Sequence, residues 1–198
     1  MNKIIFALLG ALLLISCDQN KESDKGDVYY NQGEYAKAVK AYTQHLSLKP
    51  ADEIVLYNRG RAYEEIGKYE LAIKDFNEVL VINPKNDQAV LSIGKNYYRN
   101  QDYENAAFQF DKAFKLNPQN AQAALLLARA NHKSGEVDLA MEFYDKAISL
   151  KKNYAEAYMY RGALKIYLNK MTSGCSDIKR AKNLGFDAAN ELYTKYCG

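Results

Sequence analysis

The sequence predicts an all-α solenoid built from successive antiparallel helix pairs. Pro50, Pro84 and Pro118 stand 34 residues apart, and the surrounding sequence repeats with the same period. A fixed period of this length indicates stacked two-helix units, none of which can bury its apolar face alone. Small and aromatic residues recur in register with the prolines, at Gly26, Gly60, Gly94 and Ala128 and at Tyr42, Phe76, Phe110 and Tyr144.

Residues 1–16 precede the repeats and are expected to be a signal peptide. Lys3 supplies a positive charge, and the apolar stretch 4–15 is shorter than the roughly 20 residues that a membrane-spanning helix needs. Leu-Ile-Ser-Cys at 14–17 resembles the lipobox of bacterial lipoproteins, which implies cleavage before Cys17 and acylation of that residue. Several acyl chains would anchor the protein stably. The alternative is an ordinary secretory signal followed by a chance cysteine.

Residues 17–22 are expected to form the acylated cysteine and a short tether, which would hold the fold against a bacterial envelope membrane. We expect this membrane to be the outer one. Asp18 resembles an inner-membrane retention signal of enteric bacteria, so the inner membrane is the alternative.

Residues 23–185 are expected to hold about five repeats. In the second repeat, the apolar spacing predicts a first helix (A) over about 53–65 and a second helix (B) over about 69–81. Gly67 lies between them, where a positive φ would end helix A. Pro84 would stop helix B.

The fifth repeat departs from this pattern, as expected of a terminal unit that covers an exposed end. Lys165 replaces an aromatic residue and Gly174 replaces the alanine. Residues 186–198 are expected to form a capping helix over about 188–196, with Asp187 as its N-cap.

These repeats resemble the tetratricopeptide repeat (TPR) family, in which a small residue, aromatic residues, an alanine and a closing proline recur. The resemblance implies a right-handed solenoid whose concave groove, lined by the A helices, binds a peptide or a protein. The whole also resembles small exported TPR lipoproteins. The family's carboxylate clamp is matched only by Asn58, so that particular function does not carry over.

The family's groove positions, placed on this sequence, predict a partner-binding surface with an apolar and tyrosine floor and a basic centre in repeats three and four. An acidic or carboxylate-bearing partner would suit that charge. Ordinary solvated helix faces are the alternative. The floor positions are Tyr57, Leu91, Leu125 and Met159, and the candidate groove residues are Tyr30, Tyr57, Asn58, Arg61, Lys95, Tyr98, Arg99, Arg129, His132 and Lys133.

Cys175 and Cys197 are an even pair once Cys17 is set aside. In an oxidising compartment they are expected to form a disulfide that ties the last B helix to the capping helix. Two cysteines that never pair are the alternative. The C-terminal region also resembles the cap of many bacterial exported TPR proteins, in which two cysteines recur.

Composition and motifs argue against several classes of function. The net charge of +3 gives no support for nucleic-acid binding, and there is no basic tail. His45 and His132 lie in no metal-ligand or catalytic motif, and His45 is expected to pack against a neighbouring helix. We therefore expect no enzyme, no metal and no cofactor.

Taken together, the sequence predicts a non-catalytic adaptor that holds a protein or peptide partner at a bacterial envelope membrane. A piloting chaperone that delivers one outer-membrane client is the alternative function. An enzyme subunit is a third, less favoured interpretation.

Overall fold

The computed structural model describes residues 22–198. The signal peptide expected at 1–16 and the acylated Cys17 lie outside this range, as does nearly all of the tether. Within the range, no helix has the length and apolar character needed to cross a membrane.

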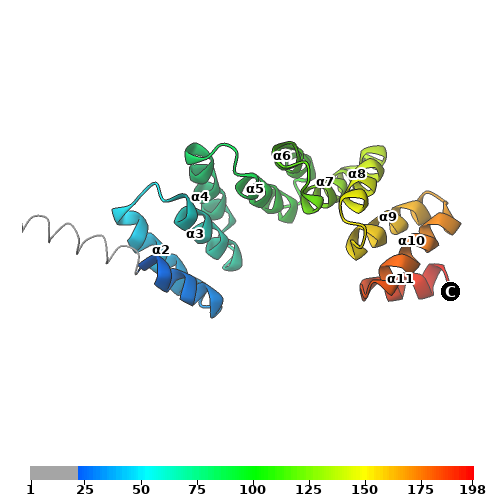
Figure 1. Ribbon diagram of the computed structural model, residues 1–198, viewed down its shortest axis with the longest axis horizontal. Helices are drawn as coiled ribbons and strands as arrows, with labels where there is room; N and C mark the ends of the chain where they lie inside the picture. The colour runs from blue at the N-terminus through cyan, green and yellow to red at the C-terminus, as the bar shows by residue number, and fades with distance from the viewer. Residues whose placement is uncertain (1–21) are drawn as a thin grey trace, which may run out of the picture. The chain divides into compact units, whose positions relative to one another are not determined.

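The protein divides into two compact units, one ending at Ile93 and the other covering Gly94–Gly198. In the first unit, helical residues 22–31 are followed by three complete helices, in which α3 packs between α2 and α4 (Figure 1). The elements are α2 (Tyr35–Leu48), α3 (Glu53–Glu65), α4 (Tyr69–Ile82) and the first part of α5 (Asp87–Arg99).

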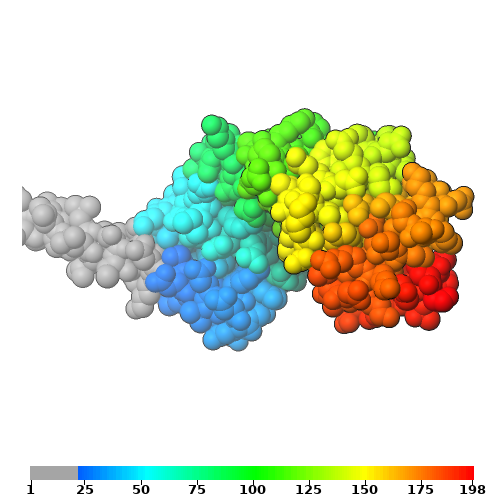
Figure 2. All heavy atoms as spheres, turned by 45° about the vertical axis from the view of Figure 1, so that its right-hand side comes forward, coloured from blue at the N-terminus to red at the C-terminus, as the bar shows by residue number. Residues whose placement is uncertain are grey.

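The second unit continues the series of helix pairs. Each helix from α6 to α11 packs against the next in the chain. Figure 2 shows α11, in red, beside the orange surface of α10. The elements are the end of α5, α6 (Tyr103–Leu116), α7 (Ala121–Ser134), α8 (Val137–Leu150), α9 (Ala155–Tyr167), α10 (Met171–Asn183) and α11 (Ala188–Tyr196).

The helices of the second repeat confirm the prediction. Helix A is α3, Glu53–Glu65, and helix B is α4, which ends at Ile82, one residue later than expected. The side chain of Asp52 accepts a hydrogen bond from the Val55 amide and so caps α3. Gly67 has φ of 72°, the left-handed conformation that favours glycine.

In the repeats before the fifth, an aromatic ring of the second helix covers a small residue of the first. Phe76 on α4 is fully buried and lies over Gly60 on α3, where an added Cβ would come within 2.7 Å of the ring. The same geometry recurs between Gly94 and Phe110 in the second unit. The small residue is therefore required for the two helices of a repeat to approach each other.

The fifth repeat replaces this contact with a closer one. A Cβ on Gly162 of α9 would lie 2.8 Å from the backbone oxygen of Gly174, and a Cβ on Gly174 would lie 2.9 Å from the backbone oxygen of Gly162. The two helices thus meet backbone to backbone. The glycine that departs from the repeat pattern has a defined packing role.

The capping helix α11 spans Ala188–Tyr196, as predicted. The prediction that Asp187 caps it was wrong, because Asp187 has helical dihedral angles and its side chain makes no capping hydrogen bond. The Phe186 carbonyl instead accepts from the Ala189 amide and opens the first turn. Cys175 and Cys197 form a disulfide that closes the end of α11 onto α10, which confirms the predicted pair.

Candidate functional site

The predicted apolar floor is mostly wrong. Leu91 and Leu125 are each 1% exposed and Met159 is 6% exposed, so these side chains belong to the core. Tyr57 is half-buried, with its ring 5.5 Å from that of Phe76. Large apolar residues at these positions fill the space between helices, so they offer a partner little surface.

The candidate groove residues form a repeated pair of an arginine and a tyrosine. Arg61 lies 4.9 Å from the ring centre of Tyr30, and Arg129 lies 5.4 Å from that of Tyr98. In both pairs the arginine follows the tyrosine by 31 residues, so each arginine stacks on the preceding repeat. A guanidinium over an aromatic face is attracted by the ring, and its edges stay available for hydrogen bonds.

The two arginines differ in their charge environment. Nη1 of Arg129 lies 3.1 Å from Oε1 of Glu156, and its guanidinium also lies 4.6 Å from the ring centre of Tyr160. Its charge is therefore already balanced within the second unit. This ion pair weakens the predicted basic centre, because it neutralises one of its cations. The repeat pattern of the sequence does not show that Glu156 faces Arg129.

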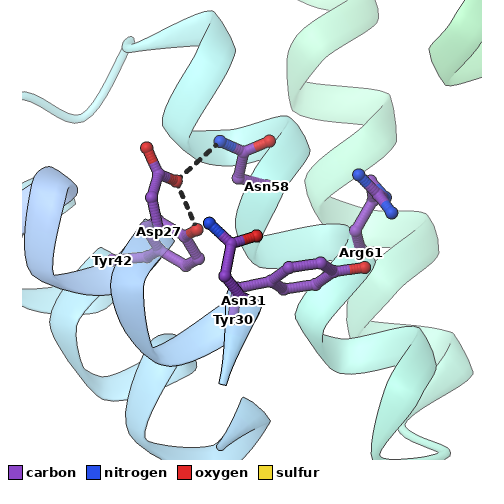
Figure 3. Close-up of a pocket in the computed structure, with 6 residues that line it drawn as sticks. All are labelled: Asp27, Tyr30, Asn31, Tyr42, Asn58 and Arg61. Carbon is purple, nitrogen blue, oxygen red and sulfur yellow. Dashed lines mark hydrogen bonds between the residues drawn. The ribbon is translucent and has the colours of Figure 1, made fainter. Parts of the chain in front are cut away.

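Arg61 has no such carboxylate partner among residues 22–198. It is exposed and lines a cavity of about 260 Å³ in the first unit (Figure 3). In the figure, the ring of Tyr30 points toward Arg61, and Asp27 lies on the opposite side of the cavity. The lining residues are Asp27, Tyr30, Asn31, Tyr42, Asn58 and Arg61.

Asp27 is held in place by two hydrogen bonds to the same oxygen. Its Oδ1 accepts from the hydroxyl of Tyr42 at 2.6 Å and from the side-chain amide of Asn58 at 3.1 Å. Burial and the bond to Asp27 both raise the pKa of the Tyr42 hydroxyl, so it stays protonated and continues to donate. Asp27 is exposed, so its carboxylate remains accessible to a further hydrogen-bond donor.

The cavity therefore offers a fixed acceptor and a fixed cationic donor to one ligand. Asn31 is exposed between them and adds an amide that can both donate and accept. This combination suits a polar segment of a peptide that includes a carboxylate. The sequence prediction found Tyr30, Asn58 and Arg61, and it missed Asp27 and Tyr42. In the sequence, Tyr42 is marked only as one of the aromatic residues that recur with the repeat.

The other candidate residues lie in the second unit. Lys95 is half-buried and Arg99 is exposed, both on α5 with Tyr98. On α7, His132 is half-buried, with its ring 6.4 Å from that of Tyr144, and Lys133 is exposed. Burial lowers the pKa of His132, with a further contribution from Lys133. These side chains are spread along two helices, α5 and α7.

The remaining histidine is structural, as predicted. His45 is 1% exposed, and its Nε2 lies 2.9 Å from Oδ2 of Asp52, the residue that caps α3. Across residues 22–198, no group of histidine, cysteine, aspartate and glutamate side chains has an arrangement that would hold a metal ion.

The family is shown by a direct sequence match. The family model described as "Tetratricopeptide repeat" matches residues 23–87 and 91–158, which is more than half of the chain. The protein therefore belongs to the tetratricopeptide repeat family. This repeat is a scaffold typical of protein–protein interaction, and proteins built from it are generally non-catalytic.

Solved structures agree with this assignment. The chain is similar to a structure titled "Crystal structure of MamA", with 25% identity and a TM-score of 0.74, covering 86% of this chain and 97% of that one. MamA 41-end from Desulfovibrio magneticus RS-1 shares 18% identity with a TM-score of 0.78, covering 84% and 94%.

A structure titled "Functional Characterization of Pseudomonas Aeruginosa pilF" shares 15% identity with a TM-score of 0.75, covering 84% of this chain and 76% of that one. Because these last two structures share only 18% and 15% identity with this chain, their similarity shows the fold alone. No curated protein sequence matches the chain.

Proposed function

We propose that this protein is a non-catalytic adaptor that holds a protein partner through the cavity of its first unit. The cavity bordered by Arg61 and Asp27 is the docking point, and a carboxylate-bearing segment of the partner is its ligand. The observation that carries this proposal is the difference between two repeat-related arginines. Arg129 is paired with Glu156. Arg61 is exposed, lines the cavity and forms no ion pair with any carboxylate of residues 22–198.

The geometry favours recognition over catalysis. Arg61 is fixed by its stacking on Tyr30, and Asp27 is fixed by Tyr42 and Asn58. Groups that are already held in position lose little conformational entropy when a ligand binds. Tyrosine and arginine are also the side chains most often found at interface hot spots. The cavity thus has the chemistry of a small, specific anchor point.

We further propose that acylation of Cys17 anchors this adaptor to a bacterial envelope membrane, with the outer membrane as its location. The lipobox-like residues 14–17 support this proposal. Fractionation of cells that make the wild-type chain or the Cys17→Ser variant tests it. The wild type is expected in the membrane fraction and the variant in the soluble fraction. Equal distribution of the two would refute the anchor.

Site-specific photocrosslinking tests the docking point. A photoreactive residue at Asn31, inside the cavity, is expected to give one dominant protein adduct in cells that make the full chain. The matched position is Lys74, which is exposed on α4 and lies outside the residues that line the cavity. The adduct from Asn31 is expected to disappear when Arg61→Glu is added and to persist when Lys74→Glu is added.

Two outcomes would contradict the proposal. One is an adduct of equal yield from Asn31 and Lys74, which would show that the cavity has no special role. The other is an adduct at Asn31 that survives Arg61→Glu. If an adduct forms in cells but the partner never co-purifies, the alternative function is favoured, in which the protein is a piloting chaperone that binds its client transiently.

A further inference from the structure

An apolar cavity of about 410 Å³ lies in the second unit, where α9, the start of α10 and α11 meet. Three of its lining side chains are large and exposed: Tyr167 is 76% exposed, Met171 is 48% exposed and Tyr196 is 43% exposed. They come from three different helices and gather around one opening. The remaining lining residues are Ala163, Ile166 and Leu192.

Lysines border this apolar surface. Lys170 precedes Met171 in the chain, and Nζ of Lys195 lies 5.1 Å from the ring centre of Tyr196. Both lysines are exposed, and neither forms an ion pair with another of the residues at 22–198. Long lysine side chains can lie along an apolar surface while the ammonium group reaches outward.

The charge of the chain is concentrated in this region. Residues 161–198 contain seven lysines and arginines but three aspartates and glutamates, a net charge of +4, whereas residues 1–160 have a net charge of −1. Arg161 and Lys165 are paired with Asp177, so the excess lies on the exposed lysines and Arg180 of α10 and α11. Lys170 and Lys195, at the edge of the apolar cavity, belong to this cationic segment.

The lining favours a lipid surface over a protein. Specific protein and ligand pockets combine an apolar wall with a few convergent polar groups that fix the ligand's orientation. Here the only side-chain polar atoms in the lining are the two tyrosine hydroxyls. Tyrosine with flanking lysine is the combination enriched where proteins meet the headgroup layer of a bilayer. Anionic headgroups would complement the exposed lysines, at short range and in a salt-dependent manner.

We propose that the surface around this cavity, formed by Tyr167, Met171 and Tyr196 with Lys170 and Lys195 at its edge, docks onto an anionic phospholipid bilayer. The apolar side chains enter the headgroup boundary and the lysines contact lipid phosphates. The disulfide from Cys175 to Cys197 holds the end of α11, so Tyr196 is in place before contact. This proposal is independent of any lipid on Cys17 and of the cavity at Arg61.

A single-tryptophan reporter tests it, because the natural chain contains no tryptophan. The full chain with Tyr167→Trp is mixed with phosphatidylglycerol vesicles or with phosphatidylcholine vesicles. With phosphatidylglycerol, the tryptophan emission is expected to shift to shorter wavelength and to be quenched by brominated acyl chains. With phosphatidylcholine, or at high salt, neither effect is expected. Phe108→Trp on α6, at a side chain 65% exposed in the same unit, is the matched reporter and is expected to remain unchanged.

Charge variants complete the test. Lys170→Glu with Lys195→Glu is expected to abolish the shift at position 167. Lys112→Glu with Lys146→Glu, which alters exposed lysines on α6 and α8, is expected to leave it intact. The proposal is overturned if the reporter at 167 shows no shift, or a shift equal to that at 108. Since both reporters carry the same N-terminus, membrane attachment through residues 1–21 cannot produce the difference.

Discussion

Arg161 donates two parallel hydrogen bonds to Asp177, from Nε at 2.7 Å and from Nη2 at 2.6 Å. Arg59 makes the same pair of bonds with Asp75, at 2.8 and 2.7 Å. In both pairs the aspartate is buried and lies 16 residues after the arginine. Each pair joins the two helices of one repeat: Arg59 and Asp75 join α3 to α4, and Arg161 and Asp177 join α9 to α10.

Loss of the arginine is expected to destabilise the protein more in the Arg59 pair than in the Arg161 pair. Asp75 is 2% exposed, so Arg59→Leu would leave a buried charge without its partner, at a cost of about 2–3 kcal/mol. This cost is below the usual cost of breaking a buried ion pair, because the Arg59 side chain is 18% exposed. Arg161→Leu should cost less, because Nζ of Lys165 still lies 2.7 Å from Asp177. Hydrogen exchange in α3–α4 and in α9–α10 measures the two losses separately.

A double variant checks that interpretation. Arg59→Leu with Asp75→Leu removes both charges, so it is expected to recover most of the stability that the single change loses. If the double variant is less stable than Arg59→Leu alone, the loss comes from packing, and the buried-charge explanation is wrong.

The backbone contact in the fifth repeat predicts an unequal response to alanine. Gly174→Ala would press a Cβ against backbone atoms of α9, which cannot rotate away, and we expect a loss of about 2–3 kcal/mol. Gly60→Ala meets the ring of Phe76, a side chain that can adjust, and we expect about 1 kcal/mol. Urea unfolding followed by circular dichroism gives both values. Equal losses would contradict the distinction.

The disulfide predicts a local loss of stability. Cys175 and Cys197 are separated by 22 residues, for which the loop-entropy model gives a stabilisation of about 3 kcal/mol. Cys175→Ser with Cys197→Ser is therefore expected to speed amide exchange in α11 and to leave exchange in α3 and α4 unchanged. Unaltered exchange in α11 would show that packing against α10 alone holds the helix.

His132 predicts a dependence of stability on pH. Its pKa is lowered in the folded chain by burial, so the unfolded chain takes up a proton first as the pH falls. The free energy of unfolding should therefore decline as the pH falls below the unfolded value of about 6.5 and continue to decline until the folded pKa is reached. His132→Gln is expected to flatten this decline, because the variant has no imidazole to titrate. An identical slope in the variant would refute the assignment.

The sequence was sufficient for the fold because the repeat supplies the same information several times. Proline, glycine and the small–aromatic pair fix where each helix ends and how closely two helices approach, so the bounds of α3 and α11 were predicted to the residue. The disulfide followed from the pairing of two cysteines in a terminal unit. These features depend on local spacing, which a sequence shows directly.

The candidate site was predicted less well because it depends on contacts between repeats. Leu125 and Met159 occupy groove positions of the family, yet their size places them in the core. Glu156 neutralises Arg129 from the next repeat, and no periodic pattern in the sequence marks that residue as its partner. Asp27 is held by hydrogen bonds from Tyr42 and Asn58, and the sequence does not show that these three residues lie together.

The most direct measurement of the central claim compares how a single and a double neutral variant bind the partner that crosslinking identifies. Arg61→Gln removes the cation that lines the cavity, and Arg129→Gln with Glu156→Gln removes a pair of charges that already balance each other. Isothermal titration should show the dissociation constant rising about tenfold or more for Arg61→Gln, as expected for loss of a charged hydrogen bond. The double variant should bind nearly as the wild type does. Unchanged binding by Arg61→Gln, or a larger loss in the double variant, would contradict the account.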